Sequence, residues 1–305
     1  MTHANSYSAV LAACLLLGAL HACSAVRPTI LLDRRGDGHG PGGYQLPEHP
    51  AFSSGSFDLT AVSLARDGSD YVIQATFAAR IAKTEIFITR DDRRSLQPQS
   101  VDFYFQIDGP GPRSDQALPG RRLAFVQGQG WHRAVVLSPV PRALRRALAS
   151  STTLADRVCV PERVQVRGRS LRARVPVACF GPWPPVAVAV AVTATRFVGS
   201  FEVVDGSNRP EALTMPVHAA SGECRLDEVG GMACHISGCN PCGGHPQVLD
   251  VLDPEEIPVA DLGDYDSERG RLAQIPMIPL NIQPVIKREA AHGRGGSEGT
   301  QQAVR

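Results

Sequence analysis

The sequence predicts an all-β protein, an antiparallel β-sandwich with one short helix and a cysteine-rich insertion. Three observations lead to this fold class. Short apolar runs recur from residue 29 to about residue 204, turn-forming residues separate them, and Gly (29) and Pro (24) are plentiful among the 305 residues. Short runs with frequent turn signals are typical of strands in two packed antiparallel sheets. This stretch holds roughly nine to eleven strand candidates.

The first half of the stretch contains a predicted hairpin and a clearly alternating strand. Residues 56–64 (SFDLTAVSL) and 71–77 (YVIQATF) flank residues 65–70 (ARDGSD), which contain a turn dipeptide. This arrangement predicts a β-hairpin. In residues 100–107 (SVDFYFQI) every second residue is apolar, so we expect one face of that strand to be buried. Residues 133–137 (RAVVL) predict a further strand.

The second half contains the best helix candidate and the densest strand. Residues 141–150 (PRALRRALAS) carry leucines four positions apart, which predicts a helix. Residues 158–166 and 171–177 predict the two strands of a second hairpin. Residues 186–195 (VAVAVAVTAT) predict a strand that is apolar on both faces.

The first 22 residues are predicted to be a removable export signal of the lipoprotein type. Residues 9–20 are uncharged and apolar, but shorter than the about 20 residues that a membrane-spanning helix needs. Residues 20–23 (LHAC) resemble the lipobox of bacterial lipoproteins, in which Cys23 would be acylated and become the mature amino terminus. The alternative is ordinary cleavage near Ala22 or Ala25, which would release a soluble secreted or periplasmic protein.

The cysteines predict disulfides in the exported protein. Of the eight cysteines, Cys14 lies in the removed segment and Cys23 would carry lipid. Six remain, namely Cys159, Cys179, Cys224, Cys234, Cys239 and Cys242. An even number of cysteines in an exported chain is typical of disulfide pairs. For the last four of them the pairing stays open, and together with nearby histidines they also offer enough ligands for Zn²⁺.

One disulfide can be predicted from strand register. If residues 168–170 form a three-residue loop, Arg167 faces Leu171 across the hairpin. Each step outward from the loop pairs the preceding residue of the first strand with the following residue of the second. In this register Cys159 faces Cys179. Directly opposed residues can lie within disulfide reach. The alternative is two buried free thiols.

Several short motifs follow one another in a fixed order along the chain. They are residues 33–44 (DRRGDGHGPGGY), 46–47 (LP), Phe52, 55–59 (GSFDL), 101–104 (VDFY), 118–121 (LPGR), Trp131, 174–176 (RVP), 181–182 (GP), 248–252 (VLDVL) and 275–278 (IPMI). This series resembles the carboxy-terminal binding-module family of glucodextranase, which is also appended to amylopullulanases. That family is related to DOMON-like sandwiches and to family-nine carbohydrate-binding modules. The resemblance implies a β-sandwich that binds carbohydrate or holds an enzyme at the cell envelope, and it implies no hydrolysis.

Three aspartates are candidates for a calcium site. Asp33, Asp37 and Asp58 offer carboxylates, and Ca²⁺ prefers oxygen ligands. Backbone carbonyls of the Gly-Pro-Gly turn at residues 40–42 could join them. The alternative is that Asp37 stabilises a turn and Asp58 the start of a strand.

Four aromatic residues are candidates for stacking on sugar rings, and they are Trp183, Trp131, Tyr44 and Tyr104. Aromatic faces can cover the apolar faces of sugars. The alternative is packing in the core. Trp183 stands between two prolines and is the one we expect to be more exposed.

Composition and motifs argue against several function classes. The 31 basic residues nearly balance the 30 acidic ones, which argues against nucleic acid as a partner. The Gly-x-Ser-x-Gly pattern at residues 295–299 lies in a polar stretch without the strand and helix that activate such a serine. We therefore expect no enzyme activity.

The sequence thus predicts one binding module over residues 23–286, with a disordered tail at residues 287–305. We expect it in the bacterial cell envelope, anchored to the membrane through lipid. Its expected partner is a polysaccharide or cell-envelope glycan, with a surface protein complex as a further partner. One alternative is a structural or protein-interaction lipoprotein that has lost the sugar site. Another is a metal-linked or redox-linked periplasmic module.

Overall fold

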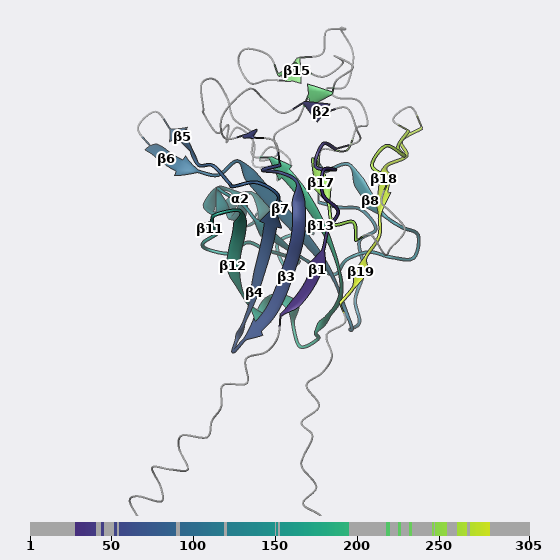
Figure 1. Cartoon of the computed structure of the whole chain (residues 1–305). Coiled ribbons are helices and arrows are strands. Elements are labelled where there is room, and N and C mark those ends of the chain that lie inside the picture. Colours follow the sequence, from purple (N-terminus) through teal and green to yellow (C-terminus); the bar gives the residue numbers. More distant parts are fainter. Residues whose placement is uncertain are drawn as a thin grey trace, which may run out of the picture.

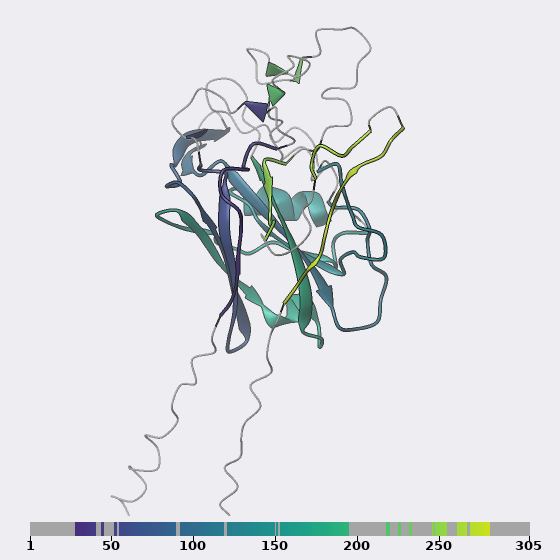
Figure 2. The ribbon, with the colours of Figure 1, turned by 45° about the vertical axis from the view of Figure 1, so that its right-hand side comes forward.

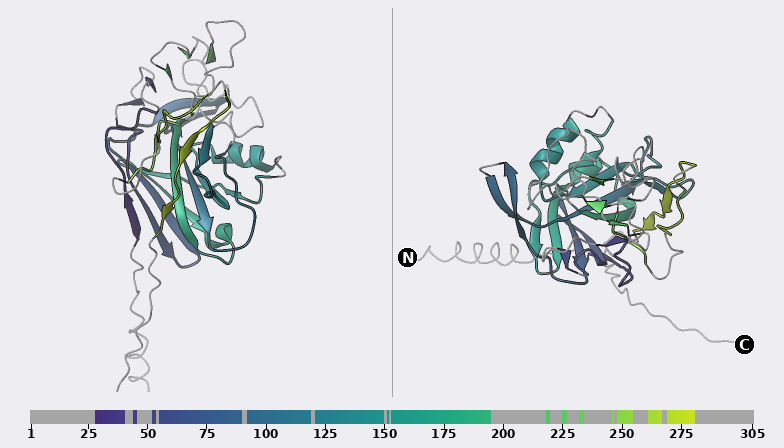
Figure 3. Two further views of the ribbon diagram at one scale, coloured as in Figure 1. Left: turned by 90° about the vertical axis from the view of Figure 1, so that its right-hand side faces the viewer. Right: turned by 90° about the horizontal axis from the view of Figure 1, so that it is seen from above.

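Two sheets that share one hydrophobic core make up most of the structure (Figure 1). The computed structural model describes residues 28–40, 44–45, 52–53, 55–89, 92–118, 121–149, 151, 153–194, 218–219, 225–226, 232–233, 246, 248–254, 261–266 and 269–280. Helix α2 (Pro141–Ala149) lies on the side of the six-stranded sheet that faces away from the five-stranded sheet (Figure 3).

The five-stranded sheet is antiparallel throughout. Its spatial order is β1 (Thr29–Leu32), β3 (Leu59–Asp67), β4 (Asp70–Phe77), β12 (Ser170–Pro176) and β11 (Gln165–Arg167). Along β12 the buried residues alternate with half-buried or exposed ones. Successive side chains of a strand point to opposite faces, so one face of this sheet packs on the core and the other meets solvent.

The six-stranded sheet contributes the other wall of the core. Its spatial order is β10 (Val158–Cys159), β9 (Arg133–Leu137), β7 (Gln99–Ile107), β13 (Pro185–Ala194) and β17 (Asp250–Val251), and β19 (Ile278–Pro279) also pairs with β13. The pairs are antiparallel except β9 with β10. Along β13 only Val186 is not fully buried, in agreement with its Val and Ala residues on both faces.

Short pairs and one 3₁₀ turn complete the described elements. The pairs are β2 (Tyr44–Gln45) with β14 (His218–Ala219), β5 (Thr84–Thr89) with β6 (Asp92–Leu96), β8 (Leu123–Phe125) with β18 (Ala273–Ile275), and β15 (Arg225–Leu226) with β16 (Met232–Ala233). The 3₁₀ turn η3 (Val177–Phe180) follows β12. Figure 2 separates the purple and blue strands of the five-stranded sheet from the green β13.

Phe180 in η3 packs against rings from both sheets. Its ring lies edge-on to Tyr71 of β4 at 4.9 Å and to Phe105 of β7 at 5.0 Å between centroids. Edge-to-face pairs at this spacing are favourable beyond the area that they bury. The all-β class, the antiparallel sheets and the single short helix of the described chain confirm the sequence prediction. The sandwich packing stays a prediction, which the shared core favours.

The first hairpin was predicted correctly, but its loop is shorter than expected. β3 and β4 continue through the predicted six-residue loop until Asp67 pairs with Asp70. Only Gly68 and Ser69 remain in the turn, and Gly68 has φ +62°. A two-residue turn with glycine first matches the twist of the flanking strands, which explains the extension.

The disulfide between Cys159 and Cys179 is present, but the register that predicted it is wrong. β11 and β12 are joined by a two-residue turn, and Arg167 pairs with Ser170. The predicted strand over residues 158–166 is in fact two strands, and β10 belongs to the six-stranded sheet. The disulfide therefore ties an edge strand of one sheet to the turn that ends β12 of the other.

A buried ion pair lies inside the core beside the middle of β7. Arg121 donates from Nε to Oδ2 of Asp102 at 2.6 Å and from Nη2 to Oδ1 at 3.2 Å. Tyr104 donates its hydroxyl to the same carboxylate at 3.1 Å, and its oxygen accepts from the Leu118 amide at 3.2 Å. Asp102 and Arg121 are 0% and 2% exposed, respectively. The network satisfies charged groups that water cannot reach.

Several predictions concern parts of the chain outside the described residues. They are the export signal with Cys23, the cysteines Cys224, Cys234, Cys239 and Cys242, and the tail at residues 287–305. Within the described part of the chain, no helix combines the length and the apolar character needed to cross a membrane.

Candidate functional site

Five aspartates from three segments of the chain, one of them far from the others in sequence, converge into what we call the acidic cluster. Its members are Asp33, Asp37, Asp58, Asp250 and Asp253. The first two follow β1, the third precedes β3, and the last two lie on and after β17. Two backbone hydrogen bonds bring the segments together: the Asp33 amide donates to the Thr60 carbonyl at 3.0 Å and the Gly40 amide to the Leu249 carbonyl at 2.7 Å.

A glycine allows the closest approach within the acidic cluster. A Cβ atom at Gly38 would lie 2.6 Å from the Cα atom of Asp58, a distance that side chains do not tolerate. Glycine at this position therefore lets the loop after β1 pass directly over Asp58.

Three carboxylates of the acidic cluster are spaced as ligands of one cation. Asp37, Asp58 and Asp250 each offer an oxygen, and these oxygens lie within 4.8 Å of one another. Ligand oxygens sit about 2.3–2.6 Å from Ca²⁺, so two oxygens bound to the same ion are at most about 5 Å apart. The donor set, carboxylate oxygens alone, suits a hard cation.

Backbone amides orient these carboxylates and leave particular oxygens without a hydrogen bond. Oδ2 of Asp58 accepts from the Gly36 amide at 3.0 Å, and Asp250 accepts from Leu59 and Val251 at 2.5 and 2.8 Å. Oδ1 of Asp33 accepts from the Asp253 amide at 2.5 Å. The buried oxygens Asp33 Oδ2, Asp37 Oδ1 and Asp58 Oδ1 have no partner within the described structure. Buried polar atoms are rarely left unpaired, and Asp37 and Asp58 also belong to the set with ligand spacing, so their free oxygens fit a bound cation.

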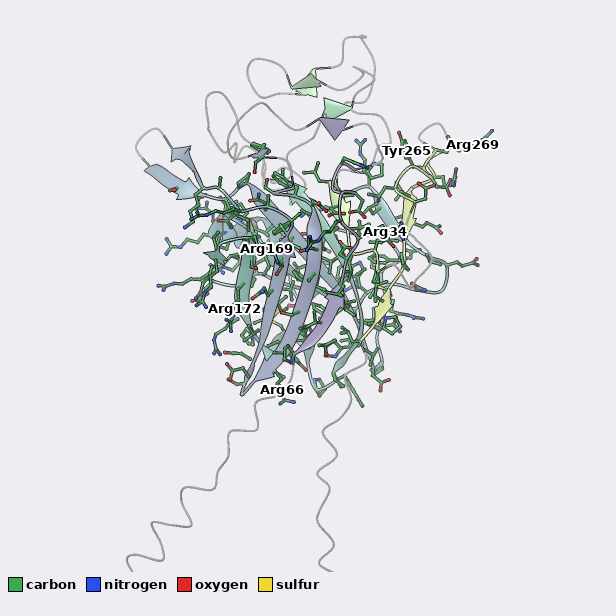
Figure 4. All side chains as sticks on the ribbon, viewed as in Figure 1. Arg34, Arg66, Arg169, Arg172, Tyr265 and Arg269 are labelled. Atoms are coloured by element: carbon green, nitrogen blue, oxygen red, sulfur yellow. A yellow bond between two sulfur atoms is a disulfide. The ribbon has the colours of Figure 1, made fainter. Side chains whose placement is uncertain are left out.

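Burial and mutual repulsion disfavour the ionised forms of Asp33, Asp37 and Asp250. Burial, and then the charges of Asp33 and Asp37, raise the pKa of Asp250 well above its ordinary value. Burial also raises the pKa of Asp33 to about 8 and the pKa of Asp37 above its usual range. Arg34 lies beside the cluster (Figure 4), where its Nε is 3.8 Å from Asp253. A divalent cation would offset the remaining repulsion.

Trp183 is the exposed aromatic side chain among the large hydrophobic residues of the described chain. It is 46% exposed and lies in the turn between η3 and β13. Its ring packs on the backbone of Gly109, where an added Cβ would lie 2.5 Å from Cδ1 of the indole. The Asp108 amide donates to the Pro184 carbonyl at 3.2 Å, which holds the two loops together. The indole is therefore fixed in place and still open to a ligand.

Comparison with known proteins identifies the family. Residues 30–278 match the family described as the C-terminal binding module, SLH-like, of glucodextranase. The chain belongs to this family. No individually curated protein matches it. The match confirms the resemblance that the sequence motifs predicted, and the family is the binding module of glucodextranase.

The structure brings the predicted aspartates together and adds two. Asp37 and Asp58 belong to the set of three with ligand spacing, and Asp33 lies next to them in the acidic cluster. Asp250 and Asp253 were missed. Asp250 is the one charged residue inside the apolar run at residues 248–252, and this isolation could have indicated a buried carboxylate. Its neighbourhood depends on pairing between segments about 190 residues apart, which the sequence does not reveal.

Two of the four predicted stacking residues are core residues of this binding-module family member, which corrects the prediction. Trp131 is 1% exposed, donates from Nε1 to the Gln116 carbonyl at 2.7 Å, and carries the Arg157 guanidinium 4.3 Å above its ring. Tyr104 is fully buried beside Asp102. Neither ring offers a face to a sugar. For Tyr44 the structure describes only the backbone, in β2, so its side chain stays a prediction.

Proposed function

We propose that the chain is a carbohydrate-binding module that acts outside the cell or at the cell surface and has no catalytic activity of its own. The observation that carries the proposal is the fixed and exposed indole of Trp183 on Gly109 in a member of a binding-module family. A rigid aromatic ring loses little conformational entropy when a ligand stacks on it. A polysaccharide or cell-envelope glycan is the ligand class that fits this family best.

Trp183→Ala is expected to weaken saccharide binding by at least about tenfold, since removal of a central aromatic contact commonly costs this much. Titration calorimetry with maltoheptaose and soluble α-glucan, and pull-down with purified cell-wall polymer, would measure the effect. Trp183→Phe is the matched control and should retain most of the affinity. Gly109→Val keeps the indole but forces it off its support, and should behave like the alanine variant. Equal binding by Trp183→Ala and the unchanged protein would rule out Trp183 as the platform.

We further propose that the acidic cluster holds Ca²⁺. The ligand spacing, the three unpaired buried oxygens and the raised pKa values of Asp33, Asp37 and Asp250 support this proposal. A bound cation would join the loop after β1, the residue before β3 and strand β17. Its role would be to hold these segments in place.

We also propose export through residues 1–22 and a lipid anchor at Cys23, on the basis of residues 20–23 (LHAC). The membrane would then be reached through lipid, and a surface protein complex remains a further partner. If no saccharide binds, the structural or protein-interaction role is the function that remains.

A further inference from the structure

A groove of about 740 Å³ runs along one edge of the five-stranded sheet. One wall of the groove is β12, and the wall opposite it is the segment between β10 and β11. The charged lining residues of the groove are Asp70, Glu162, Arg163, Arg167, Arg172 and Arg174. Ligand sites of proteins commonly have volumes of this order. We call this feature the arginine groove.

The arginine groove exists because β11 is shorter than β12. β11 pairs with β12 only from Ser170 to Arg172, whereas β12 continues to Pro176. Along residues 173–176, the edge of β12 that faces away from β4 therefore has no strand partner within the described structure. An unpaired strand edge presents backbone amides and carbonyls, which are strong hydrogen-bonding groups. These groups can bind the hydroxyls of a sugar.

The wall opposite β12 is held in place by three contacts. The disulfide from Cys159 to Cys179 fixes its start. The Arg145 guanidinium of helix α2 donates to the Val160 carbonyl at 3.1 Å. In addition, β10 pairs with β9 of the other sheet. A wall with this support is preorganised, which lowers the entropic cost of binding.

The arginine groove concentrates positive charge that lacks an internal counter-ion. Arg174 binds Asp67 and Asp70, so the acidic group of Asp70 is already paired. Within the described part of the chain, the guanidinium groups of Arg163, Arg167 and Arg172 make no ion pair or hydrogen bond. Glu162 is the remaining acidic residue of the lining.

The position of Arg172 distinguishes it from an ordinary surface arginine. It is half-buried on β12 (labelled in Figure 4), at the last position where β12 pairs with β11 before its edge becomes unpaired. The formal net charge of the whole chain is only +1, so the positive character of the groove is local. Guanidinium groups bind carboxylates and phosphates through two parallel hydrogen bonds.

We infer that the arginine groove binds an anionic polysaccharide, whose acidic groups pair with Arg163, Arg167 and Arg172 and whose hydroxyls meet the free edge of β12. This inference rests on the proposed function and names the ligand class for a second surface, separate from Trp183. The acidic group is a carboxylate or a phosphate, because guanidinium recognises both. The recessed shape between a strand edge and a fixed wall favours a chain-like ligand over a flat membrane.

The test compares two double variants of equal charge in the otherwise unchanged protein. Arg163→Gln/Arg172→Gln removes two groove cations, whereas Arg66→Gln/Arg142→Gln removes two exposed arginines elsewhere (Arg66 is labelled at the lower end of the sheet in Figure 4). Titration calorimetry with oligogalacturonate tests the carboxylate source, and a glycerol-phosphate oligomer tests the phosphate source. We expect at least about a tenfold loss of affinity for one of these probes in the groove variant, and less than about twofold in the control.

The outcomes separate this inference from the proposed function. The proposed function is supported if maltoheptaose binding is lost in Trp183→Ala and retained in the groove variant. The inference is supported if the groove variant loses affinity for an acidic probe. Equal losses in the two double variants would mean unspecific attraction and would overturn the inference. Binding of neither acidic probe, or binding of anionic phospholipid vesicles alone, would also overturn it, whether or not maltoheptaose binds.

Discussion

Replacement of Asp102 by alanine is expected to lower the free energy of unfolding by about 3–5 kcal/mol, the usual cost of leaving one partner of a buried ion pair alone. The variant would leave the Arg121 guanidinium, 2% exposed, without its carboxylate. The Tyr104 hydroxyl would lose its acceptor in the same place. Denaturant unfolding followed by circular dichroism would measure the change.

Two further variants make the Asp102 prediction specific. Asp67→Ala breaks an exposed ion pair with Arg174 and should have a far smaller effect, because solvent screens that pair. Asp102→Leu/Arg121→Met replaces both charges by apolar groups and should recover much of the stability lost by Asp102→Ala. If Asp102→Ala unfolds at the same denaturant concentration as the unchanged protein, the buried pair does not contribute as described.

Calcium is expected to raise the melting temperature of the chelator-treated protein, and Asp250→Asn is expected to abolish that rise. At a calcium concentration 100 times the dissociation constant, binding adds about 2.7 kcal/mol of stability. Asparagine keeps a single carbonyl oxygen, so it can accept from only one of the Leu59 and Val251 amides, and it removes the negative charge that attracts the cation. Differential scanning calorimetry with chelator, with Ca²⁺ and with Mg²⁺ would measure the effect.

The Asp250→Asn variant should lose much more stability with calcium than with chelator. With chelator the change should be small, because relief of the repulsion around Asp250 offsets the loss of one backbone hydrogen bond. With calcium it should be less stable. Asp115→Asn, an exposed aspartate elsewhere, is the control and should leave both curves unchanged. A calcium response that survives in Asp250→Asn would place the ion elsewhere.

The pH dependence of the chelated protein follows from the same groups. Burial raises the pKa of Asp33 to about 8 in the folded protein, above the ordinary value of 3.8. The folded state therefore binds the proton more tightly than the unfolded state. This contribution to stability is fully present below about pH 4 and is lost as the pH rises through about 8. The gain in stability from calcium should consequently be largest at the alkaline end of this interval.

Local sequence patterns predicted the strands well and their pairing less well. The alternation in residues 100–107 and the dense apolar run at residues 186–195 became β7 and β13 almost to the residue. Turn length was the weak point, because a single residue of difference shifts the register, as it did between β11 and β12. The disulfide itself was predicted correctly but by a wrong register, because its two cysteines meet through a contact between sheets that no hairpin register describes.

The candidate site could be predicted only where its residues lie near one another in sequence. Asp33, Asp37 and Asp58 share one stretch of motifs and were found together. Asp250 joins them only because β17 pairs with β13 and the loop after β1 bonds to Leu249. The exposure of aromatic residues was likewise unpredictable for Trp131, whose burial depends on Tyr104 and Phe125 packing around it. Trp183 was the exception, because two flanking prolines mark a surface turn.

The disulfide between the two sheets makes complete folding of this protein depend on the redox state of the compartment that it occupies. Cys159 and Cys179 can form a lasting disulfide only in an oxidising compartment, and a bond of this kind contributes about 2–4 kcal/mol. A chain retained in a reducing cytosol would lack both this stability and the fixed wall beside β12. Newly made copies would therefore lack the disulfide until they reach an oxidising compartment, and a ligand surface that depends on that wall would be completed only there.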